Sequence, residues 1–427
     1  MTLYRGTFID CPDDPFAGGA LRALPDGGLL VRDGVVVARG PWAELAAAHA
    51  DDEVVDLSGG LVLPGFVDTH VHFPQVRVIG ALGLPLLDWL DQRALPEECK
   101  LVDDAYAAQI AREFIGSLLR AGTTSALVFG AHFASAVDIL FGEAEASGLR
   151  VSCGVVVSDG VLPQALLTTP ERSISDAVAL AERWHGRGRL RYAVTPRFSL
   201  SCSDALLGAC AEARAAIPGA LFTSHVNENF AEIAKVEADH GTTYVGTYDR
   251  HGLLDRLSVL AHDVHPRDEE LAVLAARGSS IAHCPCSNSA LGSGMFPLRR
   301  HLDAGVRVAL GCDVGGGTSF SLLREGLQAA FMQSLMGDAG VPLGAAHLLW
   351  LATAAGASAL GLDSVGHLGV GMEFDAVWLR PASGTTLDIG LRHAADDADA
   401  VAKAFALGDT ADVAAVFVGG DRVWDRL

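Results

Sequence analysis

The stretch VLPGFVDTHVH, residues 62–72, is an apolar run that ends in two histidines separated by one residue. Successive side chains of a strand point to opposite faces, so His70 and His72 would lie on the same side of one strand. Such a pair also arises by chance in any strand that alternates polar and apolar residues. The meaning of the pair therefore depends on the rest of the chain.

Seven further runs of this kind follow, and the segments between them have apolar residues at helical spacing. This alternation predicts parallel β/α units. The segment 103–122, for example, begins with acidic residues and ends at Gly122, which predicts a helix. Eight units without a glycine-rich phosphate turn after the first favour an α/β fold of the closed (β/α)8 TIM-like barrel type over an open doubly wound sheet. The other runs span residues 123–131, 150–159, 189–199, 219–227, 257–264, 279–285 and 306–315.

The two ends of the chain have a different pattern. Residues 29–64 and 371–427 contain short alternating strands with Asp-Gly and Gly-Gly turns, which are typical of hairpins. We expect both ends to join in one small β-sandwich domain. The predicted domains are then residues 1–64 and 371–427 for the β domain and residues 65–370 for the barrel. A chain of 427 residues is long enough for both.

Charge and composition narrow the class of protein. The net charge of −21 disfavours nucleic acid and anionic membrane surfaces as partners, and favours a small-molecule substrate. Eight sparse cysteines indicate no disulfide framework, and the N-terminal segment lacks an apolar stretch, so a cytoplasmic location is expected. The apolar stretch 343–362 contains His347 and has no basic flank, which favours buried helix over a membrane span.

Ligand-type side chains also end later runs, where the chemistry of a barrel is located. Taken singly, each has a simpler interpretation as a hydrogen-bonded histidine or a helix cap. Their convergence at one end of a barrel predicts a metal site. Besides the first pair, these residues are His225, His262, His283 and Asp313. The predicted ligands are His70, His72, His225 and Asp313.

Three imidazoles and one carboxylate suit zinc, with iron as second choice, whereas magnesium and calcium prefer oxygen ligands. We expect one Zn²⁺ per chain. Glu228 lies three residues after His225, just past the predicted strand end. A glutamate there is often a solvated loop residue, but next to a predicted ligand it is a candidate general acid and base.

The order P-G-x-x-D-x-H-x-H, H-x-x-E, a further His and a final Asp resembles the amidohydrolase superfamily. Two-metal members of this superfamily bridge their ions with a carboxylated lysine on the fourth strand. The three lysines of this chain, Lys100, Lys235 and Lys403, lie outside all eight runs, which indicates a mononuclear site. Within the superfamily, the segments 70–75, 84–90, 196–203, 224–229, 281–294 and 311–323 resemble guanine deaminases, and 366–379 resembles their return into the flanking β domain.

The resemblance implies hydrolytic deamination of guanine to xanthine and ammonia in purine catabolism, by a homodimer. It implies that Glu228 moves a proton from water to ring N3, and that Asp313 and His262 assist the later transfer to ammonia. A purine is recognised by side chains that have hydrogen-bond donors, hydrogen-bond acceptors or flat apolar faces. The implied substrate-binding residues are Gln75, Trp89, Leu87, Arg197, Phe198, His225 and Glu228.

Several alternatives stay open at this point. A sibling enzyme acting on 8-oxoguanine, a pterin or a triazine is the nearest, and an inactive barrel with a scaffold role is more remote. The cytidine-deaminase pattern of H-x-E with P-C-x-x-C does not fit, because Cys286 is followed by Ser-Asn-Ser. His283 and Asn288 either support the site or only pack, and the roles of Asp263 and His265 are undecided.

Overall fold

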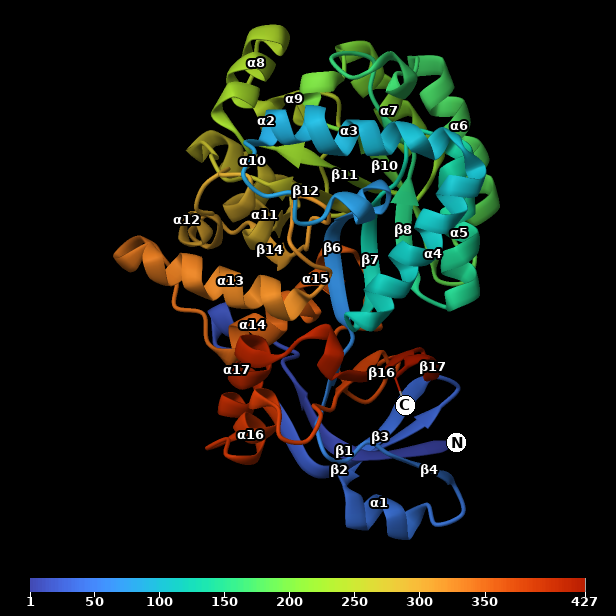
Figure 1. Cartoon of the computed structure of the whole chain (residues 1–427), viewed down its shortest axis with the longest axis vertical. Coiled ribbons are helices and arrows are strands. Elements are labelled where there is room, and N and C mark those ends of the chain that lie inside the picture. The colour runs from blue at the N-terminus through green and yellow to red at the C-terminus, as the bar shows by residue number, and fades with distance from the viewer. Residues whose placement is uncertain (427) are drawn as a thin grey trace.

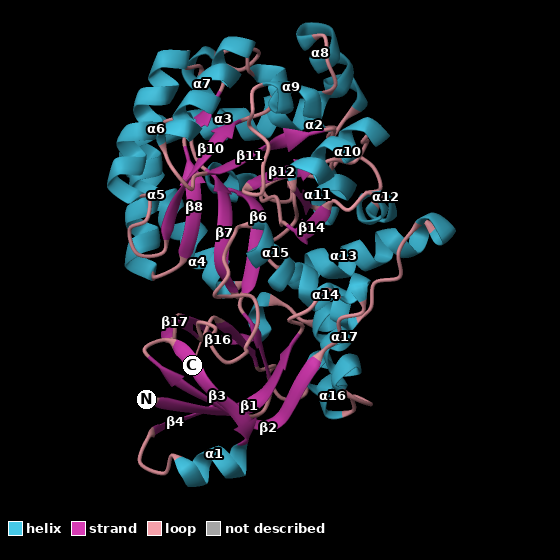
Figure 2. Cartoon of the chain, turned by 180° about the vertical axis from the view of Figure 1, so that it is seen from behind, coloured by secondary structure: helices cyan, strands magenta, loops and turns pink. Residues whose placement is uncertain are grey.

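The computed structural model describes residues 1–426. It has two parts, a helix-covered barrel and a smaller β domain that holds both chain ends (Figure 1). Seen from behind, the strands form two separate groups, one in the barrel and one in the β domain, and most helices surround the barrel strands (Figure 2). The predicted α/β fold class with a (β/α)8 barrel is confirmed.

Eight parallel strands form the barrel wall in the order β14-β13-β12-β11-β10-β8-β7-β6, with the short β9 beside β10. The backbone N–H of Asp313 donates to the carbonyl of His70, and that of His72 to Val314, each at 2.8 Å. These bonds join the segment after β14 to β6 and close the ring at the end that carries the histidines. The strands are β6 Phe66–His72, β7 Thr123–Phe129, β8 Arg150–Gly154, β9 Val156–Val157, β10 Leu190–Pro196, β11 Leu221–Val226, β12 Ser258–His262, β13 Ser280–His283 and β14 Arg307–Leu310.

Helices cover the outside of the barrel. The predicted helix at 103–122 is confirmed as α4, Asp104–Arg120, and the Asp103 side chain caps it by accepting from two backbone N–H groups. The others are α2 Leu86–Trp89, α3 Leu95–Glu98, α5 Ala134–Ser147, α6 Pro170–Trp184, α7 Asp204–Ala216, α8 Phe230–His240, α9 Tyr244–Arg250, α10 Asp268–Arg277, α11 Pro285–Ala290, α12 Leu298–Asp303, α13 Leu322–Leu335, α14 Ala345–Ala352 and α15 Ala354–Ala359.

The small domain is built on one eight-stranded sheet from both chain ends, ordered β17-β16-β15-β5-β1-β2-β3 with β4 beside β1. Its own apolar core includes Phe8, Phe374 and Trp378. The domain boundaries at residues 64 and 370 stay a prediction. The strands are β1 Thr2–Asp10, β2 Arg22–Arg32, β3 Val35–Pro41, β4 Glu53–Asp56, β5 Leu61–Pro64, β15 Ala376–Leu379, β16 Val413–Val418 and β17 Asp421–Asp425, and the helix α1 spans Trp42–Ala48.

Two segments differ from a simple hairpin or helix. Residues 371–427 contain the hairpin of β16 and β17, but α16, Thr386–Arg392, and α17, Asp397–Leu407, separate it from β15. The apolar stretch 343–362 is divided between α14 and α15 because Thr353 leaves the helical conformation between them. Among the described residues, no helix has the length and apolar character needed to cross a membrane.

Candidate metal centre and active site

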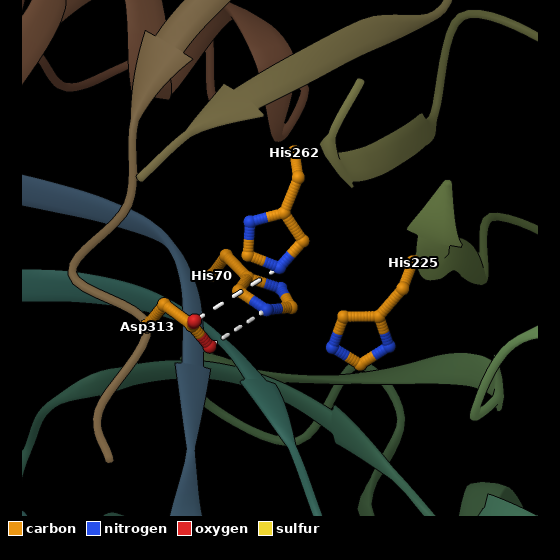
Figure 3. A group of neighbouring side chains, drawn as sticks. All are labelled: His70, His225, His262 and Asp313. Atoms are coloured by element: carbon orange, nitrogen blue, oxygen red, sulfur yellow. Dashed lines mark ion pairs between the residues drawn. The ribbon is translucent and has the colours of Figure 1, made fainter. Parts of the chain in front are cut away.

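Five side chains meet at one end of the barrel, each from a strand end. His70 and His72 come from β6, His225 from β11, His262 from the last residue of β12 and Asp313 from just after β14. Four of them point toward one another in Figure 3. The backbones of His262 and Asp313 have φ angles of 85° and 46°, a left-handed conformation that is strained for these residues. Such strain is common where a fold aims side chains into a site.

The distances among these groups fit a single ion. The Nε2 atom of His72 lies 3.2 Å from Nε2 of His70, 3.2 Å from Nε2 of His225 and 3.2 Å from Oδ1 of Asp313. Oδ1 of Asp313 is also 3.2 Å from Nε2 of His70. Two ligand atoms at about 2.1 Å from one tetrahedral zinc are about 3.4 Å apart, so these atoms are spaced as a ligand set.

His262 lies at the edge of this set. Its Nε2 atom is 3.9 Å from Oδ2 of Asp313 and 3.4 Å from Oε2 of Glu228. A group of four potential ligand atoms within 4.8 Å of one another contains His262 together with His70, His225 and Asp313. His72 has the shorter contacts, so the geometry favours His70, His72, His225 and Asp313 as ligands and places His262 beside the general-base candidate.

Burial keeps the imidazoles neutral, which is the state that binds metal. It lowers the pKa of His72 to about 4, and it lowers the pKa of His70, His225 and His262 as well. Burial acts to raise the carboxyl pKa of Asp313. Hydrogen bonds with His70 and His72 and the neighbouring imidazoles together outweigh burial and hold that pKa well below its usual range. The site therefore offers neutral nitrogens and one carboxylate, as a zinc or iron site requires.

Hydrogen bonds on the far side of two rings fix which nitrogen faces the centre. Nδ1 of His225 lies 2.5 Å from the Arg197 carbonyl, and Nδ1 of His262 lies 3.1 Å from Oδ1 of Asn288. Only an N–H can bond to these acceptors, so Nε2 of each neutral ring carries the free lone pair. The open question about Asn288 is thereby answered, because it orients His262.

Glu228 follows β11 and is 3 % exposed. The hydroxyl of Ser293 donates to its Oε1 at 2.8 Å, which leaves Oε2 facing His262. Burial and the charge of Asp313 raise the pKa of Glu228 to about 8. A carboxylate with such a pKa can both accept and return a proton near neutral pH, as general acid–base catalysis needs. The sequence pattern did not identify Ser293.

A small cavity lies beside these groups. Asp313 and His262 line it together with six of the seven expected substrate-binding residues, which are Gln75, Trp89, Arg197, Phe198, His225 and Glu228. Figure 1 shows α2 and α3 crossing the barrel near the ends of β10 and β11. Leu86 and Trp89 of α2, with Leu90 directly after it, supply one wall of the cavity.

The expectation for Leu87 is wrong. Leu87 is 40 % exposed, and the cavity is lined by Leu86, Trp89 and Leu90 instead. The short helix α2 explains this, because residues three and four positions apart share a helix face and the next residue along points away. Leu86 and Trp89 also pack with Leu291 in a small apolar cluster. A helix register set by tertiary packing is not visible in the sequence.

Glu98 and His132 were not identified from the sequence. The Glu98 carboxylate accepts from Nη1 of Arg197 at 2.6 and 2.9 Å and from the Gln75 amide at 2.8 Å, and Nε2 of His132 lies 3.3 Å away. Burial acts to raise the carboxyl pKa, but the Arg197 charge together with the contacts of His132 and Gln75 outweighs burial and lowers that pKa. Both residues lie in helix or loop segments without a motif, so no sequence signal marked them.

The undecided residues have structural contacts. Oδ2 of Asp263 lies 2.9 Å from Nε2 of the buried His301, and its Oδ1 accepts from the Asn227 amide. His265 stacks on Phe230, and its Nε2 lies 2.8 Å from the Ser293 carbonyl. His283 stacks on Phe296 instead of facing the cavity. None of the three lines the cavity.

Known proteins match this chain over its whole length. An amidohydrolase family model matches residues 61–423, and a bacterial imidazolonepropionase-like composite domain matches residues 27–51. A probable guanine deaminase of Deinococcus radiodurans is 57 % identical over 435 residues, covering 100 % of this chain and 99 % of that protein. The chain belongs to the guanine deaminases of the amidohydrolase family.

Solved guanine deaminases have the same fold. The E. coli enzyme matches with a TM-score of 0.96 at 36 % identity, and the match covers 100 % of each chain. The guanine deaminase of C. acetobutylicum, solved with guanine bound in the active site, matches with a TM-score of 0.92 at 26 % identity over 99 % of this chain and 100 % of that one. Membership of this family identifies the chain as a hydrolase that acts on C–N bonds. The histidine and aspartate cluster is a group that could hold a metal ion.

Proposed function

We propose that this chain is a zinc-dependent guanine deaminase, which hydrolyses guanine to xanthine and ammonia. The observation that carries the proposal is the placement of Glu228, with the pKa of its carboxyl raised to about 8, between a ligand set and a small cavity. The relatives named above support guanine as the substrate. The homodimer and the cytoplasmic location stay predictions.

The ligands in this proposal are His70, His72, His225 and Asp313. Their spacing and the free lone pair on Nε2 of His225 fit one ion held by four protein ligands, which would take water as a fifth ligand. When bound, a zinc ion acts as a Lewis acid that lowers the pKa of water at that position. Iron is the second choice, because imidazoles also bind iron.

The remaining chemistry belongs to the chain's own residues. Glu228 accepts a proton from the attacking water and delivers it to ring N3 of guanine, which makes C2 more electrophilic. Ser293 holds Oε1 of Glu228, so the proton moves through Oε2. His262 and Asp313 hydrogen-bond the groups at C2 and help the amino nitrogen to leave as ammonia. Little water reaches the reaction, because all these side chains are buried.

The purine is held by groups that line the same cavity. Arg197 keeps N–H groups that Glu98 does not occupy, and these can donate to the carbonyl oxygen O6 of guanine. Gln75 is also a donor toward the purine edge. Phe198 and Trp89 provide flat apolar surface for the ring, and both are buried.

The variant Glu228→Gln tests this mechanism. The glutamine keeps the shape of Glu228 and can still accept the Ser293 hydrogen bond, but it cannot carry the proton. We expect kcat to fall by about 10²–10⁴-fold with metal content unchanged, measured by ammonia release and elemental analysis.

The matched control is His70→Ala, which removes a ligand and is expected to lose both metal and activity. Wild-type turnover in Glu228→Gln would remove Glu228 from the mechanism. Full metal content in His70→Ala would exclude His70 from the ligand set.

A further inference from the structure

Glu98 joins the two polar residues that face the purine. It is the last residue of α3, is 2 % exposed, and lies between Gln75, which follows β6, and Arg197, which follows β10. Its Oε1 accepts from the Gln75 amide at 2.8 Å and from Nη1 of Arg197 at 2.9 Å, and its Oε2 accepts from the same Nη1 at 2.6 Å. The fourth member of the group is His132, from the loop after β7, whose Nε2 lies 3.3 Å from Oε2 of Glu98.

The charges in this group balance. The Arg197 guanidinium is 2 % exposed, and a buried cation is costly unless a partner neutralises it. Glu98 is that partner. His132 adds no charge, because burial lowers its pKa and keeps the ring neutral. Loss of the Glu98 charge would therefore leave Arg197 buried without an anion.

Glu98 also fixes the orientation of the Gln75 amide. The amide oxygen accepts from the backbone N–H of Gly315 at 3.0 Å, and the amide nitrogen donates to Glu98. A flipped amide would set its oxygen against the Glu98 carboxylate and its N–H₂ against the Gly315 N–H. The flip is therefore excluded, and the one hydrogen of Gln75 that is not engaged is a donor.

Arg197, like Gln75, offers the cavity only hydrogen-bond donors. A guanidinium has five N–H donors and no acceptor, and Glu98 engages only Nη1. The N–H groups on Nη2 and Nε are left for other partners. With Gln75 held as a donor, this wall of the cavity presents hydrogen-bond donors alone. It matches the acceptors O6 and N7 of guanine and opposes an amino group at C6.

We propose that Glu98 is a positioning residue that makes this wall selective for a purine with a carbonyl at C6, an inference that rests on the proposed function and deepens it. Glu98 itself does not line the cavity. It acts through Arg197 and Gln75, because it holds the Arg197 guanidinium in place and keeps the Gln75 amide from flipping. Discrimination then comes from donors that an incorrect substrate leaves unpaired.

The test compares two substrates that share the reacting 2-amino group. Guanine carries O6, and 2,6-diaminopurine carries an amino group in its place. Release of the amino group from C2 is followed with wild type, Glu98→Gln and the control Glu97→Gln, with metal content measured on each sample. Glu97 is adjacent and also buried, but it bonds to Lys100 and Tyr106 away from the cavity.

We expect Glu98→Gln to lower kcat/KM for guanine about 100-fold, mainly through KM, while metal content is retained. The same variant should change kcat/KM for 2,6-diaminopurine less than threefold, so the preference for guanine collapses. Glu97→Gln should keep both values. Equal loss on the two substrates, or an unchanged preference, would overturn the proposal, because a purely structural role does not discriminate between them.

Should Glu98→Gln not fold, Glu98→Asp provides the same comparison. It keeps the charge but is one methylene shorter, so it cannot reach both Arg197 and Gln75, and the preference for guanine should fall at least tenfold. An unchanged preference in this variant contradicts the proposal. Failure of the proposed function is a separate result, because it would be seen in the wild type as absence of ammonia release from guanine.

Discussion

Replacement of Glu232 by glutamine is expected to change how the stability of the protein depends on pH. Glu232 lies on α8, is 1 % exposed and lines the cavity. Burial and the nearby Glu228 raise its pKa from 4.5 to about 8, and the Tyr244 hydroxyl bonds to it. The folded protein therefore binds a proton at Glu232 that the unfolded chain releases between pH 4.5 and pH 8.

The sign and size of the effect follow from these two pKa values. The folded state binds more protons than the unfolded state in this window, so stability is highest below pH 4.5 and falls as the pH rises through about 8. One pKa unit corresponds to about 1.36 kcal/mol. Relative to its value below pH 4.5, the unfolding free energy is then lower by about 2 kcal/mol at pH 6 and by about 5 kcal/mol at pH 9. The difference between the two pH values is about 3 kcal/mol.

The assay is urea unfolding at pH 6 and pH 9. Wild type should lose about 3 kcal/mol more of its unfolding free energy between the two pH values than Glu232→Gln, which has no proton to lose. Glu237→Gln is the control, because Glu237 lies on the same helix but pairs with Arg267 near the surface. An equal pH dependence in wild type and Glu232→Gln would refute the assignment of a buried, protonated Glu232.

Two further substitutions test how the site is held. Ser293→Ala removes the 2.8 Å hydrogen bond to Oε1 of Glu228, so kcat should fall roughly tenfold or more with metal content unchanged, and wild-type kcat would contradict the role of Ser293. Gly311→Ala places a methyl group 2.8 Å from Cβ of His70, which must displace that ligand. Elemental analysis should show reduced metal content, and a fully loaded variant would refute the close packing there.

The barrel could be predicted from the sequence because its strands are buried on both faces and read as separate apolar runs. Polar residues at the ends of such apolar runs are easy to recognise in the sequence. His225 and Asp313 were therefore found without a structure, although they are 88 residues apart. Parallel strands bring their carboxyl ends together, so position along the run was enough to place these residues at one end of the barrel.

Other features depended on tertiary contacts that no local pattern encodes. Glu98 lies in the segment LPEECK beside Glu97, and the two glutamates look alike in the sequence. Only the fold shows that one bonds to Arg197 and the other to Lys100. Leu87 was predicted to line the cavity in place of its neighbours Leu86 and Leu90 for the same reason. Likewise, α16 and α17 were not predicted within a segment that begins and ends with strands.

The most direct test of the account measures ammonia release from guanine by the purified protein, with metal content determined on the same sample. The same assay is run with 8-oxoguanine, a pterin and a triazine. We predict xanthine and ammonia in equal amounts from guanine, about one zinc ion per chain, and much lower kcat/KM for the other three compounds. A metal-loaded protein that ignores guanine and releases ammonia from one of the others would contradict the proposed substrate.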